Sequence, residues 1–528
     1  MWLDKFVIDH YRSIENVEIN LPRNKPLVLF GPNNAGKSNI LSAFNTAIGE
    51  RYPTYVEMVD SDYYQRDKED YPEINFTCTF SEPYYRGHKV MCISYGYKTE
   101  NGRDNLIHDG EGIKYYLRNE DRAKCQAYFV DAERDIQKAF NYGSKYSLLS
   151  RFSKTIHCAM SQENKERLEN IYYEIKKAFL ETKQCKDFFR ELSSSINDVV
   201  KGFSHSLDID LSAYDPNNYA KNIRVVAKEN DEIRSFDEFG TGEQQVLLMA
   251  FVKAYMQVFT SESFILIIEE PEAHLHPLAQ RWLKEYIIQL CESGVQVIIS
   301  THSTEFLDAG YLDSLVRVYK EDRITRIKQL SAEDLVAYCV GMGVPAERTN
   351  TTNIFDFYKA CLFHDQLIGF FAEKIILVEG ETETFALPYY FRNCECSLAQ
   401  NGIEIVNCRG KSSMPKYYRL FNAYGYKCFC LFDADSEPGN NEIIKQLLGI
   451  DEINADPDIY EYSSDYMYFG KDFETYMRKF GAYGLSEDEI VEKYGFISKP
   501  CKAKIVAQES GWKLGFVLKI IEQFIQPQ

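Results

Sequence analysis

The chain has 528 residues, of which 45% are apolar and 26% charged, and this is the composition of an ordinary globular protein. It contains no low-complexity tract and no fixed-period repeat, which excludes disordered, collagen-like and solenoid proteins. The formal net charge of −19 argues against a general polyanion binder. Charge alone does not decide the matter, because a local basic patch or metal ions held by carboxylates would still allow binding to DNA.

Several features favour a cytoplasmic protein without a membrane partner. The apolar runs are far shorter than a membrane-spanning helix requires. The N-terminal stretch MWLDKFVIDHYRSIE carries charges where a signal peptide needs a continuous apolar segment. The 14 cysteines are scattered mostly singly, without the spacing of a zinc knuckle, and we expect them to be reduced thiols.

The N-terminal part of the sequence predicts strands first and helices later. Residues 3–21 predict two strands around a turn, and KPLVLF (25–30) predicts a buried strand that ends at glycine, with a helix from about Lys37. Between 160 and 203 apolar residues recur at helical spacing among Lys and Glu. This pattern predicts a helical arm, within about 140–230, that either packs on its own domain or contacts a second subunit or DNA.

Strand signals return at 264–268 and 295–300, and a second α/β series opens at 375–378 and 428–432 after a less patterned stretch. About three domains would suit the length, or two if one is large. We therefore predict an α/β protein with a first domain at 1–330, a linker at 331–370 and a second domain at 371–528.

The first functional motif is GPNNAGKS (31–38), which matches G-x-x-x-x-G-K-S between a buried strand and a helix. Such a loop cradles phosphate oxygens with backbone N–H groups, while Lys37 reaches the β and γ phosphates and the Ser38 hydroxyl coordinates Mg²⁺. The strand in FILIIEEPEAHLHP (264–277) ends in Glu269, expected in the Mg²⁺ shell, and in Glu270, expected to polarise the attacking water as general base.

Two further segments complete a candidate ATP site. His302 follows a buried strand at a place from which it could sense the γ-phosphate, and GTGEQ (240–244) opens a helix that could cap phosphate from a second subunit. The residues predicted to contact the nucleotide or its metal are Gly31, Asn33, Asn34, Gly36, Lys37, Ser38, Asn39, Gly240, Gly242 and Glu269, with Glu270 and His302 as catalytic residues.

A second set of acids follows two strands of the C-terminal part. Glu379 ends the strand at 374–378 with Glu383 one helical turn on, and the strand at 428–432 leads into Asp433 and Asp435. Carboxylates at the ends of neighbouring parallel strands converge in one crevice, and hard oxygen ligands select Mg²⁺ or Mn²⁺. Two such ions would activate the attacking water and stabilise the leaving oxygen in phosphodiester cleavage. These four acids are predicted metal ligands, and Glu379, Asp433 and Asp435 are also predicted catalytic residues.

Between Glu404 and Asp433 the chain has basic residues and no acid, with several tyrosines among them. The stretch is either a phosphate track beside the metals or a solvated basic face. Its basic residues are Arg409, Lys411, Lys416, Arg419 and Lys427.

The order of the N-terminal motifs resembles the ABC-type ATPase heads of RecF and SMC proteins, which implies that two heads sandwich two nucleotides. LVEG-x-x-E followed by D-x-D resembles the Toprim domain of topoisomerases, primases and nucleases of the OLD (overcoming lysogenisation defect) family. A head followed by Toprim is the arrangement of the OLD family, including nucleases of Gabija and some retron anti-phage systems. In the OLD-type version, Glu474 is implied as a later metal ligand, and Lys499, Lys502 or Lys504 as the cation that stabilises the pentavalent phosphate; Lys504 is our catalytic candidate, with the choice open.

The resemblance implies a nucleotide-regulated, divalent-metal-dependent DNA endonuclease in anti-phage defence, with ATP and Mg²⁺ or Mn²⁺ as cofactors. Its implied partners are DNA, further copies of the chain in a homodimer or larger oligomer, and a second defence-system protein. Two departures make hydrolysis of ATP less firmly indicated than its binding: Glu269 stands where transporters have Asp, and the signature reads GTGEQ. The sequence leaves open whether ATP activates or inhibits cleavage.

Two other interpretations were weighed against a nuclease. A non-catalytic DNA-repair or scaffold ATPase would use its Toprim lobe only to bind nucleic acid or a partner, and the intact acids Glu379, Asp433 and Asp435 argue against it. A topoisomerase or primase lacks support, because the chain shows no nucleophilic tyrosine context and no primase zinc motif.

Overall fold

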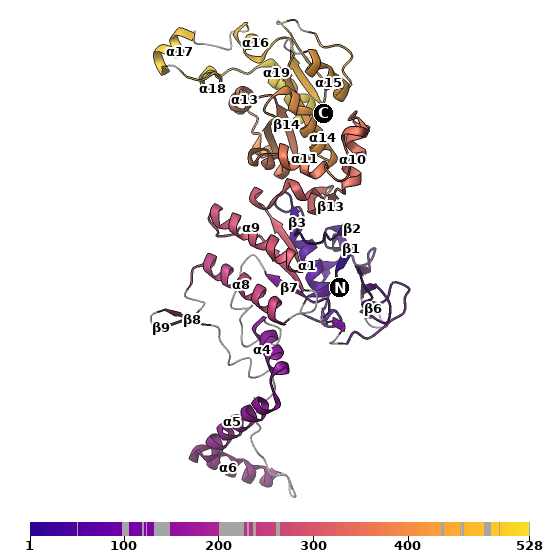
Figure 1. The fold of residues 1–528 in the computed structure, drawn as a ribbon, viewed down its shortest axis with the longest axis vertical. Helices are drawn as coiled ribbons and strands as arrows, with labels where there is room; N and C mark the ends of the chain where they lie inside the picture. Colours follow the sequence, from indigo (N-terminus) through magenta and orange to yellow (C-terminus); the bar gives the residue numbers. More distant parts are fainter. Residues whose placement is uncertain are drawn as a thin grey trace.

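The computed structural model describes residues 1–526 except 50, 98–104, 119–120, 123, 131–147, 200–225, 230–231, 236–238, 260–263, 435–437, 455, 457–458, 480–486 and 496. The described part is elongated, with the N-terminal sheets in the middle, a helical arm at one end and a third sheet with its helices at the other (Figure 1). Within these residues, no helix is both long and apolar enough to cross a bilayer.

The first sheet is antiparallel and has the order β2-β1-β4-β5-β6. Its strands are β1 (Leu3–Tyr11), β2 (Ile14–Asn20), β4 (Glu73–Phe80), β5 (Val90–Gly96) and β6 (Leu106–His108). Buried and exposed side chains alternate along β4, as in a sheet with one face against the core. The two strands predicted within 3–21 are confirmed as β1 and β2.

The second sheet has the order β13-β12-β3-β11-β10-β7, and all its neighbouring pairs are parallel except β12–β13. Its strands are β3 (Leu27–Phe30), β7 (Ala127–Val130), β10 (Phe264–Glu269), β11 (Val295–Thr301), β12 (Leu315–Glu321) and β13 (Ile324–Gln329). The four residues of β3 are all buried, as expected for a strand covered on both faces. One face packs against α1 (Lys37–Ile48), and the other against α8 (Thr241–Phe259) and α9 (Pro277–Glu292).

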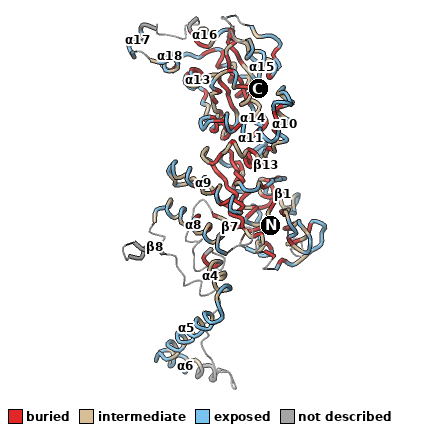
Figure 2. The backbone as a smooth tube through the Cα atoms, in the orientation of Figure 1, coloured by how far each residue is buried: buried red, intermediate tan, exposed pale blue. Residues whose placement is uncertain are grey.

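The predicted helical arm is mostly helical over residues 148–199, and its limits stay a prediction. It consists of α5 (Gln162–Glu181) and α6 (Lys183–Val199), reached through α4 (Leu148–Ala159). Phe152 of α4 packs on Phe251 of α8 with ring centroids 5.5 Å apart, which anchors the base of the arm. Beyond this base the arm extends away from the sheets (Figure 1) and is largely exposed (Figure 2). The strands β8 (Val226–Glu229) and β9 (Glu232–Ser235) pair with each other in an antiparallel ribbon.

The third sheet has the order β15-β14-β16-β18-β17, in which β15, β14, β16 and β18 run parallel. Its strands are β14 (Lys374–Val378), β15 (Ile403–Asn407), β16 (Lys427–Asp433), β17 (Tyr460–Tyr462) and β18 (Tyr466–Phe469). One face packs against α14 (Met414–Ala423) and α15 (Pro438–Leu448). The other face packs against α13 (Glu381–Asn393), α18 (Lys499–Ser510) and α19 (Gly515–Ile520). The remaining helices at this end are α16 (Phe473–Lys479) and α17 (Glu487–Tyr494).

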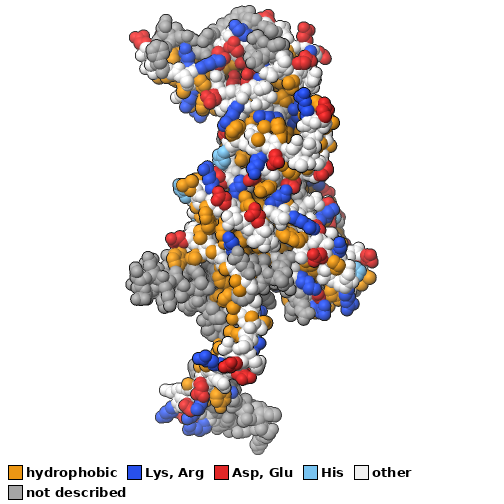
Figure 3. All heavy atoms as spheres, in the orientation of Figure 1, with side chains coloured by type: hydrophobic (Ala, Val, Ile, Leu, Met, Phe, Trp, Pro, Cys, Tyr) orange, Lys and Arg blue, Asp and Glu red, His pale blue; other side chains and the backbone are white. Residues whose placement is uncertain are grey.

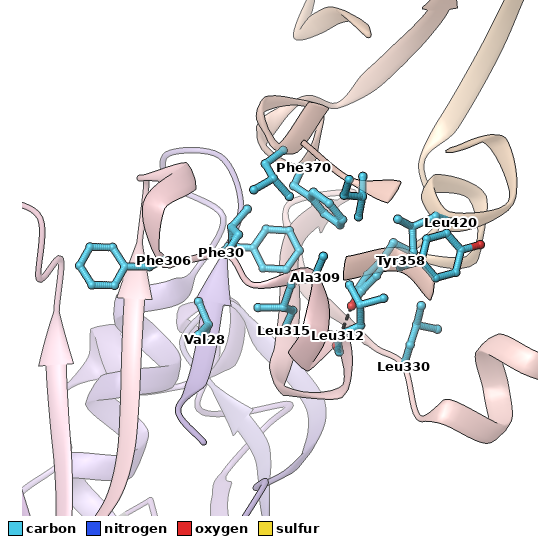
Figure 4. Close-up of a cluster of buried hydrophobic side chains, with 14 of the residues drawn as sticks. Val28, Phe30, Phe306, Ala309, Leu312, Leu315, Leu330, Tyr358, Phe370 and Leu420 are labelled. Atoms are coloured by element: carbon cyan, nitrogen blue, oxygen red, sulfur yellow. Dashed lines mark hydrogen bonds between the residues drawn. The ribbon is translucent and has the colours of Figure 1, made fainter. Parts of the chain in front are cut away.

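The segment between the second and third sheets folds into short helices: α10 (Ala332–Gly341), α11 (Ile354–Cys361), α12 (His364–Leu367) and a 3₁₀ turn, Ile368–Phe371. They do not simply tether two bodies, because one hydrophobic core runs from the second sheet through these helices into the third (Figure 4). Arg317 of β12 is buried in this junction, where it donates to the Tyr424 carbonyl (3.0 Å) and lies 3.5 Å from the centroid of the Tyr426 ring. The domain limits predicted from the sequence stay a prediction.

Candidate nucleotide and metal sites

The phosphate loop lies between β3 and α1, where the sequence predicted it. Gly31 and Gly36 have φ of 141° and 111°, a region that favours glycine. Lys37 is buried, and its Nζ donates to the carbonyls of Gly31 and Pro32 at 2.9 Å each, so the ammonium lies across the mouth of the loop. Burial lowers the pKa of Lys37 to about 8, against the opposing charge of Glu270 and its acidic neighbours.

The acids predicted to serve the nucleotide come close to this loop. Because β3, β11 and β10 are parallel neighbours, their carboxyl ends meet at one edge of the sheet. There the Ser38 hydroxyl donates to Glu269, and His302 Nε2 lies 3.6 Å from Glu270 Oε1. Burial, with the Lys37 charge second, lowers the pKa of His302 and favours its neutral form. Thus Lys37, Ser38, Glu269, Glu270 and His302 form one cluster.

Two residues that the sequence analysis missed brace this cluster. Glu272 accepts a hydrogen bond from the backbone N–H of His302 (2.5 Å), and burial raises its pKa. Thr325 of β13 is fully buried and donates to the Ala35 carbonyl inside the phosphate loop (3.0 Å). Glu272 belongs to the same EEPEAH motif as Glu270, which was a usable signal. Thr325 carries no sequence signal, because only the fold brings β13 beside the loop.

The remaining predicted nucleotide residues differ in their placement. Asn39 donates to Ser13 of the β1–β2 turn (2.8 Å), so it braces the loop from behind. Asn33 and Asn34 are exposed, and Asn34 has a positive φ of 64°. Gly240 and Gly242 lie at the N-terminus of α8, where the Gly240 N–H is capped by Glu243 at 3.2 Å. Their contact with a nucleotide stays a prediction.

Four carboxylates gather at the carboxyl end of the third sheet. Glu379 follows β14 and Asp433 ends β16, its parallel neighbour, and the Asp433 N–H lies 3.4 Å from Glu379 Oε2. Glu383 and Glu474 are buried, at 6% exposure each. The N–H of Phe473, at the start of α16, donates to Asp433 Oδ1 (3.0 Å) and brings Glu474 to the group. Figure 3 shows acidic side chains in the region where Figure 1 places α13 and α16.

The electrostatics of this acidic cluster fit a cation site. Burial, together with the charges of Glu383, Glu379 and Glu474, raises the pKa of Asp433 well above its usual value. Burial likewise raises the pKa of Glu383 to about 7, with Glu474 and Glu379 adding to it. Oxygen ligands that repel one another in this way are suited to Mg²⁺ or Mn²⁺, whose charge would replace the protons. Among the described residues, no three His, Cys, Asp or Glu side chains are already arranged to hold a metal ion. Asp435 lies outside the described residues.

Lys499 contacts the acidic cluster, whereas Lys504 contacts the Tyr389 ring. Lys499, at the start of α18, forms an ion pair of 2.8 Å with Glu474. Although burial alone would lower it, the hydrogen bond and charge of Glu474 raise the pKa of Lys499. The Lys504 Nζ lies 6.0 Å from the centroid of the Tyr389 ring, on another face of the same helix. The two lysines are five residues apart, which is not a whole number of helical turns, so their side chains point to different sides of α18.

The basic stretch between Glu404 and Asp433 does not form a continuous exposed track. Lys411 is 3% exposed and donates to the Asp433 backbone carbonyl at 2.8 Å, beneath the acidic cluster. Arg419 donates to the Met342 carbonyl (3.2 Å) on a different face, and Arg409 pairs with Asp365. Buried Lys411 is therefore not part of an exposed phosphate track, and phosphate contact by the exposed members of the stretch stays a prediction.

Comparison with known proteins agrees with this geometry. The family model of the AAA ATPase domain matches residues 1–190 and 63–307, and the model of the overcoming lysogenization defect protein-like Toprim domain matches residues 370–435. The chain belongs to the AAA ATPase domain family. Its residues 370–435 match an OLD-like Toprim domain, so the predicted order of an ATPase head followed by a Toprim domain is confirmed.

Curated relatives of this AAA ATPase with an OLD-like Toprim domain are named as nucleases. An OLD nuclease of Thermus scotoductus is 24% identical over 83% of this chain and 82% of its own length. The Old nuclease of Escherichia phage P2 is 28% identical over 58% of this chain and 52% of its own. Endonuclease GajA of Bacillus cereus is 25% identical over 39% of this chain and 32% of its own.

Proposed function

We propose that this protein is a nucleotide-regulated DNA endonuclease that uses Mg²⁺ or Mn²⁺ in its Toprim domain. The observation that carries the proposal is the acidic cluster of Glu379, Glu383, Asp433 and Glu474 with Lys499 beside it. Burial raises the pKa of Glu383 and of Asp433, and such carboxylates beside the ammonium of Lys499 suit the cleavage of a phosphodiester. The names of the relatives support DNA as the substrate.

The residues divide the chemistry between them in this proposal. Glu379 and Asp433, at the ends of two neighbouring strands, would hold the metal, and Glu383 and Glu474 from α13 and α16 would complete the ligand set. When bound, the divalent ions activate water and stabilise the leaving oxygen. Lys499 neutralises charge on the phosphate, and the Asp433 main chain is fixed by Lys411 from below and by Phe469 of β18 at the side.

The AAA ATPase head binds ATP in this proposal. Lys37 neutralises the β and γ phosphates, Ser38 and Glu269 serve the metal that accompanies ATP, and Glu270 with the neutral His302 polarises water. The contact between Ser38 and Glu269 supports the pairing, because both would ligate the same ion. Gly240 and Gly242 cap phosphate from a second head.

A cleavage assay tests the nuclease. Purified protein is incubated with supercoiled and linear DNA, with and without Mg²⁺, Mn²⁺ and ATP, and Asp433→Ala and Glu379→Gln are compared with wild type. Glu395→Gln is the matched control, since this Toprim carboxylate is 82% exposed and pairs with Lys513 away from the cluster. We expect metal-dependent cleavage by wild type and the control only. Cleavage by Asp433→Ala at the normal rate would contradict the assignment, and DNA binding without cleavage by wild type would favour a scaffold ATPase.

The arm supports the proposal of a homodimer or a larger oligomer. Helix α5 exposes apolar side chains, namely Ile171 (49%), Tyr173 (65%) and Ile175 (41%). A second copy of the arm would bury them. Light scattering on wild type and on Ile171→Lys with Tyr173→Lys tests this: we expect a smaller species for the double variant, and an unchanged mass would contradict an arm-mediated oligomer.

A role in anti-phage defence, inside the bacterial cytoplasm and with a second defence protein as partner, is inferred from the resemblance to OLD and GajA nucleases alone. Plating phages on cells that express wild type or Asp433→Ala tests this role. We expect wild type to lower the efficiency of plating and the variant not to.

A further inference from the structure

Short helix α12 connects two segments that belong to different sites. On one side lies the switch segment, residues 302–305, which begins with His302 beside Glu270. On the other lies the metal loop, residues 408–411, which joins β15 to α14 and contacts the acidic cluster. The helix starts at His364, and its first two residues, His364 and Asp365, make polar contacts with the switch segment and the metal loop, respectively.

The contacts of α12 with the switch segment come from His364. Its Nε2 lies 3.2 Å from Thr304 Oγ1 and 3.8 Å from Glu305 Oε1. Glu305 is held in turn by Arg281 of α9, whose Nε and Nη2 each donate to one carboxylate oxygen at 3.1 Å. His364 therefore contacts a carboxylate whose position depends on the head, three residues after the histidine that faces the nucleotide site.

The contacts of α12 with the metal loop come from Asp365. Both of its carboxylate oxygens accept from Arg409 Nη2 at 3.0 Å, and the Arg409 guanidinium lies 4.0 Å from the centroid of the Phe363 ring. Buried Gln366, the next residue, donates to the Asn407 carbonyl at 3.0 Å. Residues 363–366 thus fix the entrance of the metal loop.

The metal loop is in direct contact with two of the acids. Arg409 and Gly410 have positive φ angles of 56° and 116°, so this is a tight turn with a defined shape. The Gly410 N–H donates to the Glu379 carbonyl (2.7 Å), and Lys411 Nζ donates to the Asp433 carbonyl (2.8 Å). A shift of Arg409 would therefore move groups that hold the main chain of Glu379 and Asp433.

The rest of the junction is a poor place for movement. Beneath α12 lies the shared core, in which Phe370 packs on Phe30, Phe421, Tyr424 and Tyr426. Close-packed side chains resist small continuous shifts. The contacts of His364 and Asp365 are polar and half-exposed, with 58%, 51% and 47% exposure for His364, Asp365 and Arg409. They can re-form at low cost when the switch segment moves.

We propose that His364 and Asp365 are positioning residues through which the nucleotide state of the head sets the geometry of the metal loop. The proposal rests on the nuclease and ATP sites proposed above and names the route between them. Residues 302–305 contact α12, α12 contacts Arg409, and the loop of Arg409 holds Glu379 and Asp433. Neither positioning residue is among the residues proposed above to hold the nucleotide or the metal.

Removing the Asp365–Arg409 pair should cost little stability, since exposed ion pairs contribute about 0–1 kcal/mol. It should nevertheless weaken the effect of the nucleotide on cleavage. Coupling between two sites commonly changes the affinity at one site by about 5- to 150-fold when the other is occupied. This difference between a small effect on folding and a large effect on regulation separates a positioning role from a merely structural one.

The experiment measures plasmid cleavage in Mn²⁺ with and without a non-hydrolysable ATP analogue, for wild type, His364→Ala, Asp365→Ala and Asp365→Glu. Asp4→Ala is the control, because its pair with Arg23 is comparably exposed (38% and 60%) and lies in the first sheet. We expect the ratio of the two rates to approach one in Asp365→Ala and His364→Ala. Asp365→Glu, which keeps the charge, and Asp4→Ala should keep the wild-type ratio, and thermal melting should be similar in all variants.

The outcomes separate the two proposals. No cleavage by wild type in Mn²⁺ would mean that the proposed nuclease is wrong. Suppose that wild type cleaves and that the analogue changes its rate. If Asp365→Ala and His364→Ala then show the same ratio of rates as wild type, the nuclease assignment stands and the positioning role is overturned. A wild-type rate that the bound analogue does not change would overturn it as well. A double-mutant cycle of Asp365→Ala and Arg409→Ala on the ratio should show non-additivity, and additive effects would contradict the route through this pair.

Discussion

Phe30, the last residue before the phosphate loop, packs its ring edge-on against Phe370 at the start of the Toprim domain, with ring centroids 5.5 Å apart. Both side chains are fully buried, and Tyr424, at the C-terminal end of α14, contacts both rings. The loop that is proposed to hold phosphate therefore begins one residue after a core that the two domains share. Because both domains contribute side chains to this core, we expect them to unfold together.

Truncation of either ring should destabilise both domains together. We expect Phe30→Ala or Phe370→Ala to lower the free energy of unfolding by about 3–5 kcal/mol, because each change leaves a cavity in close-packed surroundings. Urea denaturation followed by circular dichroism measures the change, with Phe363→Ala, 47% exposed at the edge of the junction, as a control that should lose much less. Separate transitions, only one of which moves in Phe30→Ala, would show that the domains fold independently.

ATP binding should depend on Lys37. Its ammonium is the buried cation of the phosphate loop, and without it the loop offers phosphate only backbone dipoles. We expect Lys37→Ala to weaken ATP binding by about tenfold or more, which corresponds to about 1.4 kcal/mol. Calorimetry measures the dissociation constant, and Lys25→Ala, whose pair with Asp313 lies outside the loop, is the control. Equal affinities for wild type and Lys37→Ala would place the nucleotide elsewhere.

Metal-free protein should lose stability as the pH rises through the range of Glu383. The folded-state pKa of Glu383 is raised to about 7, above the usual 4.5, so the folded protein binds its proton more tightly than the unfolded chain does. Stability contributed by this group is therefore present at low pH and falls between about pH 4.5 and 7. Melting temperatures in a chelator should show a smaller fall over this interval for Glu383→Gln than for wild type. Mn²⁺ should oppose the fall in wild type, and parallel curves would contradict an acid held protonated by its neighbours.

The sequence predicted most of the parts of both sites but little of how they are joined. Strand-end acids such as Glu269, Glu379 and Asp433 were predictable, because a hydrophobic run followed by an acid predicts both a buried strand and the position where it ends. Thr325, Lys411 and Asp365 were not, since each acts through a main-chain or ion-pair contact made between distant segments. The segment at 331–370 gave weak periodicity because its helices are short, although several of their residues are in the shared core.

The matched pair Lys499 and Lys504 provides the last prediction. Both lie on α18, but Lys499 is in contact with Glu474 of the acidic cluster, whereas Lys504 lies beside Tyr389. If a cation at the acids stabilises charge that develops on the phosphate, its loss should slow cleavage by about 100-fold or more, as for other groups that stabilise a transition state. We expect Lys499→Ala to do so, Lys499→Arg to retain part of the activity, and Lys504→Ala to cleave at nearly the wild-type rate. Single-turnover cleavage of a plasmid at saturating Mn²⁺ measures the three rates. A large loss in Lys504→Ala with normal cleavage by Lys499→Ala would mean that α18 turns its other face to the DNA during the reaction.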